Sequence, residues 1–204
     1  MENNIEVELR GPLDENSYKV LLNHLEKNGK LLVKQNRFFI DYSTFLEGIS
    51  KRKSDIRFRI TNGKVELIVK KGEFGGYSRE EVSVFIEKDD IKNALMFMSL
   101  LGYKKGIAGN RGIVRYMIDG IEIAIQDVRK CKDPKEIYSR FFEAEIMANA
   151  ESGQEAKNKI LKFIEDLSLN IFKKEEWYEY CRNLNIKANG VFDYEKDDIN
   201  DIIN

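Results

Sequence analysis

The sequence predicts an α+β fold in which about eight mostly antiparallel strands form a sheet and amphipathic helices cover one of its faces. Three observations predict it. Apolar and charged residues alternate with a period of two in about eight segments, and three other segments carry apolar residues at helical spacing. The dipeptides Asn62-Gly63 and Asp119-Gly120 each join two strand segments and are typical of two-residue hairpin turns. We therefore expect antiparallel neighbours, joined locally.

Each element has its own signal. A strand opens the chain. Pro12 and Asp14 then mark the start of a helix whose apolar residues recur at i, i+3, i+4 and i+7, and Gly29 marks its end. The remaining strands are predicted at residues 31–42, 55–62, 64–71, 79–87, 111–118, 120–128 and 139–148. Two further helices are predicted, one from about Asp90 to Gly102 and one after Gly153. A C-terminal helix is predicted around Trp177, ahead of an acidic tail.

Composition excludes several functional classes. The net charge is -1 although 34% of the 204 residues are charged, so the charge is balanced and not one-sided as in a general nucleic-acid binder. No segment approaches the ~20 apolar residues of a membrane span and no secretory signal is recognisable, so we expect a cytoplasmic protein. Cys131 and Cys181 form no C-x-x-C motif, and His24 is the one histidine. A disulfide framework, a cysteine zinc site and a serine-histidine triad are therefore not expected.

Residue parity sorts the strand side chains into two faces. Every predicted strand has one apolar face and one face of mixed charge. The charged face holds Glu6, Glu8, Arg10, Arg57, Arg59, Glu66, Lys70, Arg79, Glu81, Arg111, Arg115, Glu122, Gln126, Glu143 and Glu145. An ordinary antiparallel sheet with this face in water would give the same pattern. If the sheet instead curls so that the charges face inward, they line a channel.

The residue types on the charged face indicate one chemistry. Arginine carries a permanent charge and a planar fork of donors that matches phosphate oxygens. Clustered glutamates supply the hard oxygen ligands that Mg²⁺ or Mn²⁺ requires. Acids and bases that alternate around one surface are therefore typical of a site for a metal ion and a polyphosphate.

In order and spacing, these residues resemble the CYTH superfamily, the triphosphate tunnel metalloenzymes, which include thiamine triphosphatases, inorganic tripolyphosphatases and class IV adenylate cyclases. The likeness runs from about residue 4 to 148. It is carried by an opening Glu-x-Glu-x-base motif at 6–10, "FFIDYS", "RFR", Lys70, "REE" at 79–81, "LGY", the arginines at 111 and 115, and the closing "FEAEI". The resemblance implies an antiparallel eight-stranded β-barrel, a tunnel with a charged interior and with helices packed outside. It divides the chain into a CYTH-like triphosphate tunnel domain, 1–170, and a C-terminal helix with an acidic tail, 171–204.

The resemblance also implies roles for the residues. Substrate-binding residues would be Arg10, Arg57, Arg59, Lys70, Arg79, Arg111 and Arg115. Ligands of Mg²⁺ or Mn²⁺ would be Glu6, Glu8, Glu81, Glu143 and Glu145. Catalytic residues would be Glu6, Glu8 and Lys70. The expected partner is a small-molecule triphosphate or inorganic polyphosphate, with no membrane and no specific nucleic acid, and a homodimer is left open.

Two residues depart from the family pattern. Arg10 stands where the family has a lysine, and an arginine cannot supply a neutral amine. Gln126 stands at the usual late aspartate, while the neighbouring Asp127 falls on the opposite face by parity. Three functions therefore remain: a metal-dependent triphosphatase acting on tripolyphosphate or a triphosphorylated small molecule, which we favour, a class IV adenylate cyclase, and a non-catalytic binder of triphosphates.

Overall fold

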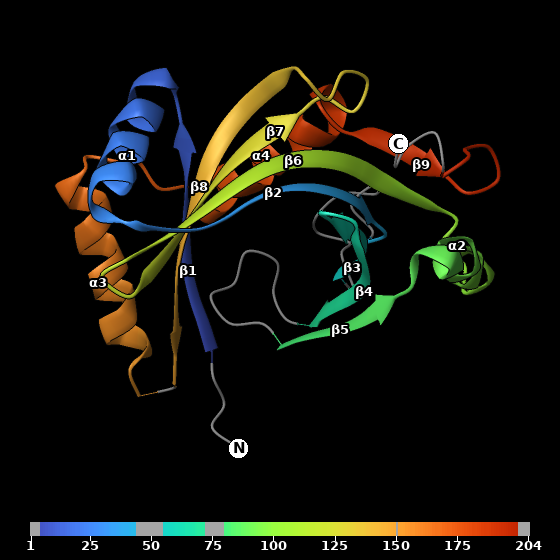
Figure 1. The fold of residues 1–204 in the computed structure, drawn as a ribbon, viewed down its shortest axis with the longest axis horizontal. Helices are drawn as coiled ribbons and strands as arrows, with labels where there is room; N and C mark the ends of the chain where they lie inside the picture. The colour runs from blue at the N-terminus through green and yellow to red at the C-terminus, as the bar shows by residue number, and fades with distance from the viewer. Residues whose placement is uncertain (1–4, 44–54, 72–79, 150, 200–204) are drawn as a thin grey trace.

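The computed structural model describes residues 5–43, 55–71, 80–149 and 151–199, which form an arched antiparallel sheet with helices on both of its sides (Figure 1). The strands follow the order β1-β8-β7-β6-β2-β3-β4-β5, and β9 pairs with β6. Their bounds are β1 Ile5–Leu13, β2 Lys30–Asp41, β3 Asp55–Thr61, β4 Lys64–Lys71, β5 Glu80–Ile86, β6 Lys105–Ile118, β7 Ile121–Arg129, β8 Ile137–Ala148 and β9 Gly190–Asp193. The helices are α1 Glu15–Asn28, the short 3-10 helix η3 Lys88–Asp90, α2 Ile91–Leu100, α3 Gly153–Asp166 and α4 Lys174–Lys187.

The sheet has the predicted antiparallel strands but is not closed. In the described part of the chain, β1 and β5 lie at its two ends and do not pair with each other. The α+β class is therefore confirmed, whereas a true eight-stranded barrel is not. What the structure shows is an arch with a concave and a convex face (Figure 1).

Local sequence signals explain the turns and the first helix. Asn62 and Gly63 have φ values of 47° and 81°, and Asp119 and Gly120 have 49° and 75°. Positive φ at both central residues is the conformation of a type I′ hairpin turn, which confirms the two predicted turns. The Asp14 Oδ1 accepts a hydrogen bond from the Ser17 backbone N–H at 2.7 Å and thereby caps α1.

The predicted apolar faces form the cores on the convex side. One core joins β1, β6, β7 and β8 to α1 and α3 through fully buried residues such as Leu21, Phe142 and Ile160. A second core joins β2, β3 and β4 to α2 around Phe58 and Leu95. Because the apolar faces are covered on this side, the charged faces point into the concavity.

Two features of the fold differ from the sequence prediction. Helix α4 does not lie outside the sheet: Leu184 and Ala188 pack on Val128 and Phe141, which belong to the inward faces of β7 and β8. The second feature is β6, which begins at residue 105 and not at 111, because its first residues pair with β9 beyond the end of β7. No helix in the described ranges is long and apolar enough to cross a membrane.

Candidate functional site

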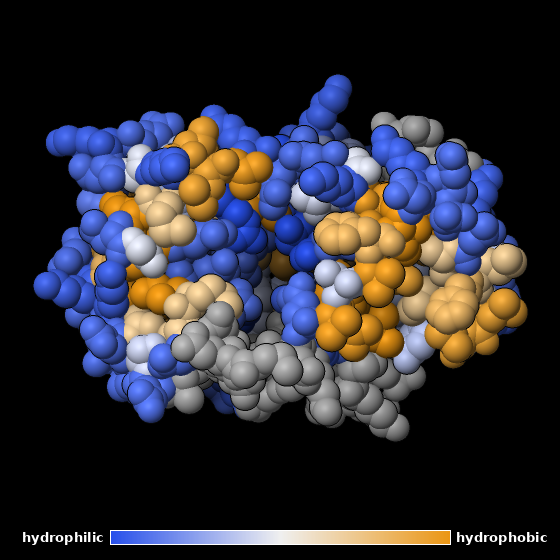
Figure 2. Space-filling view, turned by 60° about the horizontal axis from the view of Figure 1, so that its bottom comes forward, coloured by the Kyte–Doolittle hydropathy of each residue, from blue (hydrophilic) through white to orange (hydrophobic). Residues whose placement is uncertain are grey.

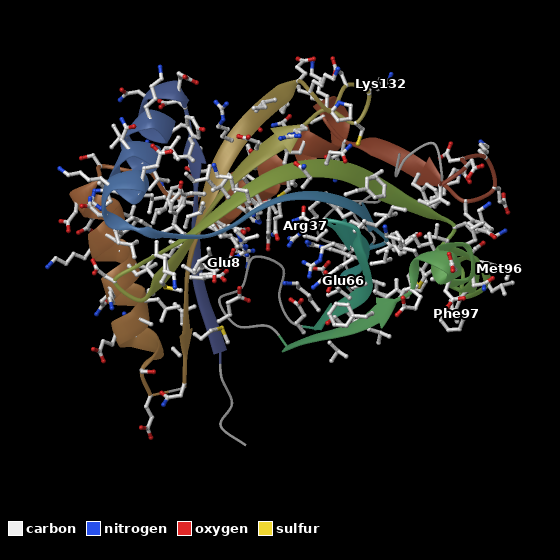
Figure 3. The ribbon with its side chains drawn as sticks, viewed as in Figure 1. Glu8, Arg37, Glu66, Met96, Phe97 and Lys132 are labelled. Atoms are coloured by element: carbon white, nitrogen blue, oxygen red, sulfur yellow. The ribbon has the colours of Figure 1, made fainter. Side chains whose placement is uncertain are left out.

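The concave face and α4 enclose a charged cavity of about 190 Å³. This space can hold on the order of ten water molecules, which is enough room for a small polyanion. Figure 2 shows a hollow between the two halves of the molecule with hydrophilic side chains inside it. In Figure 3, Glu8 on β1, Arg37 on β2 and Glu66 on β4 lie on the concave side of the arch. The charged residues that line the cavity are Glu6, Glu8, Arg10, Arg37, Asp41, Arg57, Arg59, Lys70, Arg111, Arg115, Glu143 and Glu145.

The cavity gathers most of the site residues that the sequence predicted. Its lining includes every predicted substrate-binding residue except Arg79, which lies outside the described residues, and every predicted metal ligand except Glu81. Glu81 forms an ion pair with the Nζ of Lys70 and lies 3.9 Å from Arg59. The cavity also contains Arg37, which the motif comparison missed. Strand parity was the available signal, because Arg37 and Asp41 are four residues apart on β2 and so lie on the same face.

Four of the cavity cations are each held by an acid of a strand. Arg57 donates two hydrogen bonds to the buried Asp55, at 2.8 and 3.1 Å. The Arg59 Nε lies 2.7 Å from a carboxylate oxygen of Glu66. Lys70 pairs with Glu81, and Arg115 pairs with Glu122. A phosphate that binds these cations must share or displace the acids.

Two arginines differ from these four. Arg37 and Arg111 are directly opposite each other in the register of β2 and β6. The Arg37 Nε donates to the Thr61 hydroxyl at 3.2 Å, while Arg111 donates to the Asn110 carbonyl at 2.8 Å and stacks on the ring of Phe39. Within the described residues, neither guanidinium forms an ion pair with an acid. Burial lowers the pKa of both to about 10, and for Arg37 the nearby charges of Arg59 and Arg115 add to the effect.

Buried charges without a counter-ion are costly, and other cations add to this cost: Arg59 and Arg115 act on Arg37, and Arg57 acts on Arg111. Arg111 is only 8% exposed, so water screens its charge poorly. The Arg37–Arg111 pair is therefore an arrangement that an anion stabilises. Its charge and its donors match a phosphate group.

The carboxylates on the other side of the cavity form two close pairs. Glu8 lies within hydrogen-bond distance of Glu143, and Glu6 of Glu145. Burial and the adjacent acid raise the pKa of Glu8 to about 8, and burial and Glu6 raise the pKa of Glu145 to about 9. Burial is the largest influence on Glu143 and opposes its ionisation, but Arg10, the hydrogen bond with Glu8 and Arg115 together lower that pKa. The raised pKa values of Glu8 and Glu145 therefore favour their protonated forms near neutral pH.

Paired carboxylates that share a proton have the donor chemistry of a site for a hard divalent cation, because the cation can replace the proton. The described residues include no group of three or more acidic, histidine or cysteine side chains that is already arranged around one point. The residues that would bind Mg²⁺ or Mn²⁺ are thus two carboxylate pairs and not a preformed ligand set. A complete coordination shell would need substrate oxygens and water as well.

The two departures from the family pattern meet at Glu143. The Arg10 Nη2 pairs with Glu8, and its Nε lies 3.3 Å from Glu143. The amide of Gln126 donates a hydrogen bond to the other oxygen of Glu143. Asp127 does not replace Gln126, because it lies on the convex side, where it accepts a hydrogen bond from Arg140 at 2.8 Å. Parity predicted that position correctly.

Helix α4 forms one wall of the cavity. Trp177, Cys181 and Asn189 line it from this side. The guanidinium of Arg10 lies 5.1 Å from the centroid of the Trp177 ring, and the Asn189 side-chain oxygen accepts a hydrogen bond from Arg111 at 3.4 Å. Helix α4 and the residues directly after it therefore touch both the acidic and the basic parts of the site. Its helical pattern could not reveal this, because periodicity does not say which side of a sheet a helix covers.

Comparison with models of protein families and with curated protein sequences gives no match. Solved structures do match. The PH1819 protein from Pyrococcus horikoshii OT3 is 23% identical, with a TM-score of 0.65, and the match covers 86% of this chain and 97% of that one. A candidate adenylate cyclase from Vibrio parahaemolyticus is 14% identical, with a TM-score of 0.60 and coverage of 83% and 94%.

A third match is HpAC1 from Hippeastrum, a candidate adenylyl cyclase described as having a dominant triphosphatase activity. It is 15% identical, with a TM-score of 0.57, and the match covers 91% of this chain and 99% of that one. At these identities the matches establish the fold. The chain therefore has a CYTH-like fold, as its motifs predicted.

Proposed function

We propose that this protein is a divalent-metal-dependent hydrolase that removes the terminal phosphate of inorganic tripolyphosphate or of a triphosphorylated small molecule. The observation that carries the proposal is that the half-buried Arg37 and the buried Arg111, opposite each other in the register, form no ion pair with an acid among the described residues. Seven cations and five acids line one small cavity, so its charge favours an anion. A triphosphate with about four negative charges is held more strongly there than on an open surface, because the effective dielectric is lower.

The basic side of the cavity binds the phosphate chain. Arg37 and Arg111 bind phosphate oxygens first, because no acid must leave them. Arg59, Arg115 and Lys70 then exchange an acid of the protein for a phosphate oxygen. This fixes the phosphate chain and aligns the terminal phosphorus for in-line attack by water, and positioning of this kind is the main contribution that proteins make to phosphoryl transfer.

The carboxylate pairs would hold the metal ion, and one of their carboxylates accepts the proton of the attacking water. Glu6, Glu8, Glu143 and Glu145 would bind Mg²⁺ or Mn²⁺, which supplies charge that neutralises the phosphate oxygens. Glu6 and Glu8 orient the attacking water, and a carboxylate of this group accepts its proton as the new phosphorus–oxygen bond forms. The bond between the terminal phosphorus and the bridging oxygen then breaks, pyrophosphate or a substituted diphosphate leaves, and Lys70 compensates the charge that develops on the leaving oxygen.

A class IV adenylate cyclase is the second candidate, because solved structures with this fold include candidate adenylate cyclases. Such an enzyme must also hold adenine. Among the described residues, three rings line the cavity. Arg111 lies over Phe39, Arg10 lies over Trp177, and Phe141 packs against Trp177 and Tyr180. Because each ring already has a stacking or packing partner, this favours hydrolysis over cyclisation.

A non-catalytic triphosphate binder is the third candidate, and Arg10 and Gln126 are the reason to consider it. Both donate to the Glu8–Glu143 pair. These contacts supply part of the positive charge that a metal would otherwise bring. If they prevent metal binding, the cations of the cavity still hold a triphosphate without turning it over.

One experiment separates the three functions. The purified full chain is given tripolyphosphate, ATP and thiamine triphosphate with Mg²⁺ or Mn²⁺, and released phosphate and cyclic AMP are measured together. Phosphate without cyclic AMP is the expected result. Cyclic AMP would identify a cyclase, and calorimetric binding without either product would identify a binder.

Two matched variants test the role of the arginine pair. Arg111→Gln removes the charge but keeps a polar side chain, and we expect tripolyphosphate to bind about 10- to 100-fold more weakly, since one charged hydrogen-bond donor contributes ~1.5–3 kcal/mol. Arg182→Gln is the control, because Arg182 is exposed on α4 and pairs with Glu179. Equal affinities in the two variants would contradict the proposed phosphate site.

A further inference from the structure

Helix α2 is apolar on both of its faces. Its inner face packs on the sheet through buried residues such as Leu95. Its outer face carries Met96, Phe97 and Leu100, followed by Leu101, and these four residues are between 45% and 81% exposed. Residues four positions apart are neighbours on a helix, so they form a single stripe. Lys92 and Asn93 are exposed in the first turn, but from Met96 onward the helix is apolar on both sides. A segment that is apolar all round is typical of a helix buried on every side, and the described residues bury only one side of this one.

The adjoining end of the sheet continues this apolar surface. Val82 and Val84 on β5 and Val69 on β4 are 46–62% exposed, and Val82 lies directly opposite Val69. By parity these valines lie on the convex face of the sheet, the face that α2 covers. Figure 2 shows apolar side chains gathered over this part of the molecule, and Figure 3 shows Met96 and Phe97 on the outer side of α2.

The size of this surface corresponds to a dimer interface. Seven large apolar side chains that are each about half exposed or more present on the order of 700 Å², close to the ~800 Å² that each partner buries in a standard interface. Monomeric proteins rarely expose one apolar patch of this size. The patch therefore has the area that a second protein surface would cover.

A second copy of the chain can supply that surface, because its own patch has the same area and the same apolar chemistry. The charges at the two ends of α2 are mixed: Lys88 lies among Glu87, Asp89 and Asp90, and Lys104 and Lys105 pair with acids of their own chain. A two-fold axis near Phe97 and Leu100 sets the apolar stripe of one copy against the same stripe of the other. The two α2 helices then run antiparallel, so their dipoles are opposed, which is favourable.

We propose that the protein forms a two-fold symmetric homodimer in which the outer face of α2 packs antiparallel on α2 of the second copy, flanked by Val82 and Val84. The same patch is used by both subunits, as two-fold symmetry requires. Because the patch lies on the convex side, both charged cavities remain accessible. The dimer does not depend on the function proposed for the cavity.

Analytical ultracentrifugation of the full chain tests this proposal, and we expect a particle of twice 23.8 kDa. In Leu100→Glu, a central contact is replaced by a charge, so the dimer should dissociate about 30-fold more readily, as for a hot-spot residue worth ~2 kcal/mol. Ile186→Glu is the matched control, because Ile186 is 69% exposed but lies on α4. Its dimer should be unchanged.

A second variant tests the geometry. Phe97 lies near the proposed axis, so Phe97→Cys should form a covalent dimer on mild oxidation, whereas Ile186→Cys should not. Thermal melts of the variants confirm that they are folded. A monomer at every concentration up to about 100 μM, or a dimer that Leu100→Glu leaves intact, would overturn the proposal.

Discussion

Arg37→Met removes one charge of the opposed arginine pair and is predicted to make the ligand-free protein more stable while it weakens triphosphate binding. Methionine is unbranched and of similar length, so it fills the same space. In the described structure, the Arg37 side chain donates one hydrogen bond, to the Thr61 hydroxyl, so little else is lost. The stability and the affinity of the protein should therefore change in opposite directions.

The magnitude follows from the pKa of Arg37, which burial and its cationic neighbours lower to about 10. At ~1.36 kcal/mol per pKa unit, a lowering of this size means that the charged side chain is destabilised on the order of 3 kcal/mol relative to water. Loss of the Thr61 hydrogen bond costs ~1 kcal/mol. The variant should therefore be more stable by ~1–2 kcal/mol, which corresponds to a melting temperature ~2–8 °C higher for a protein of this length.

Thermal melts with and without tripolyphosphate, in the absence of divalent ions, measure both effects. Tripolyphosphate should raise the melting temperature of the wild-type protein more than that of Arg37→Met, because binding is about 10- to 100-fold weaker in the variant. Arg182→Met serves as the control for an exposed arginine. A variant that is less stable than the wild type without ligand, or that gains as much from tripolyphosphate, would refute the argument.

Three further predictions concern the acids and the backbone. Without divalent ions, the free energy of unfolding should fall as the pH rises from about 5 to 8, by on the order of 1 kcal/mol per pH unit for each carboxyl. The raised pKa values of Glu8 and Glu145 make the folded protein hold protons that the unfolded chain has lost. Urea titrations with a flat pH profile would contradict this. Gln126→Asp adds a carboxylate beside Glu143 and should tighten Mn²⁺ binding about 10-fold by calorimetry, whereas Gln126→Asn should not. Gly11→Ala should lower the free energy of unfolding, measured by urea titration, by ~2–4 kcal/mol, since its Cβ would lie 1.9 Å from the Asn170 carbonyl oxygen. For Gly190→Ala, whose nearest contact would be at 3.5 Å, the loss should be less than ~1 kcal/mol.

Much of the site follows from strand parity. Alternation along β1 and β8 put Glu6, Glu8, Glu143 and Glu145 on one face, and the structure places all four in the cavity. Arg37 obeys the same rule, so its omission reflects the motif comparison and not a missing signal. The ion pairs of the site, in contrast, depend on which strands are neighbours, and residue parity contains no information on that.

The position of α4 was beyond the reach of the sequence for a related reason. Its aromatic residues indicate that it packs on something, but Phe141 and Val128 became its partners only because the inward face of β7 and β8 is apolar at that end. Strand β9 is only four residues long, and it exists through pairing with a distant part of β6. Short elements of this kind depend on tertiary contacts more than on their own residues.

The amino-acid sequence by itself determined the strands β1–β8, the hairpin turns, the helices and the two faces of the sheet, because these depend on backbone preferences and on a period of two or 3.6 residues. Tertiary structure alone decided that the charged faces enclose a cavity, that the sheet stays open between β1 and β5, and that Arg37 and Arg111 lie opposite each other. Curvature and register arise from pairing between distant segments, and these pairings fix which charges meet.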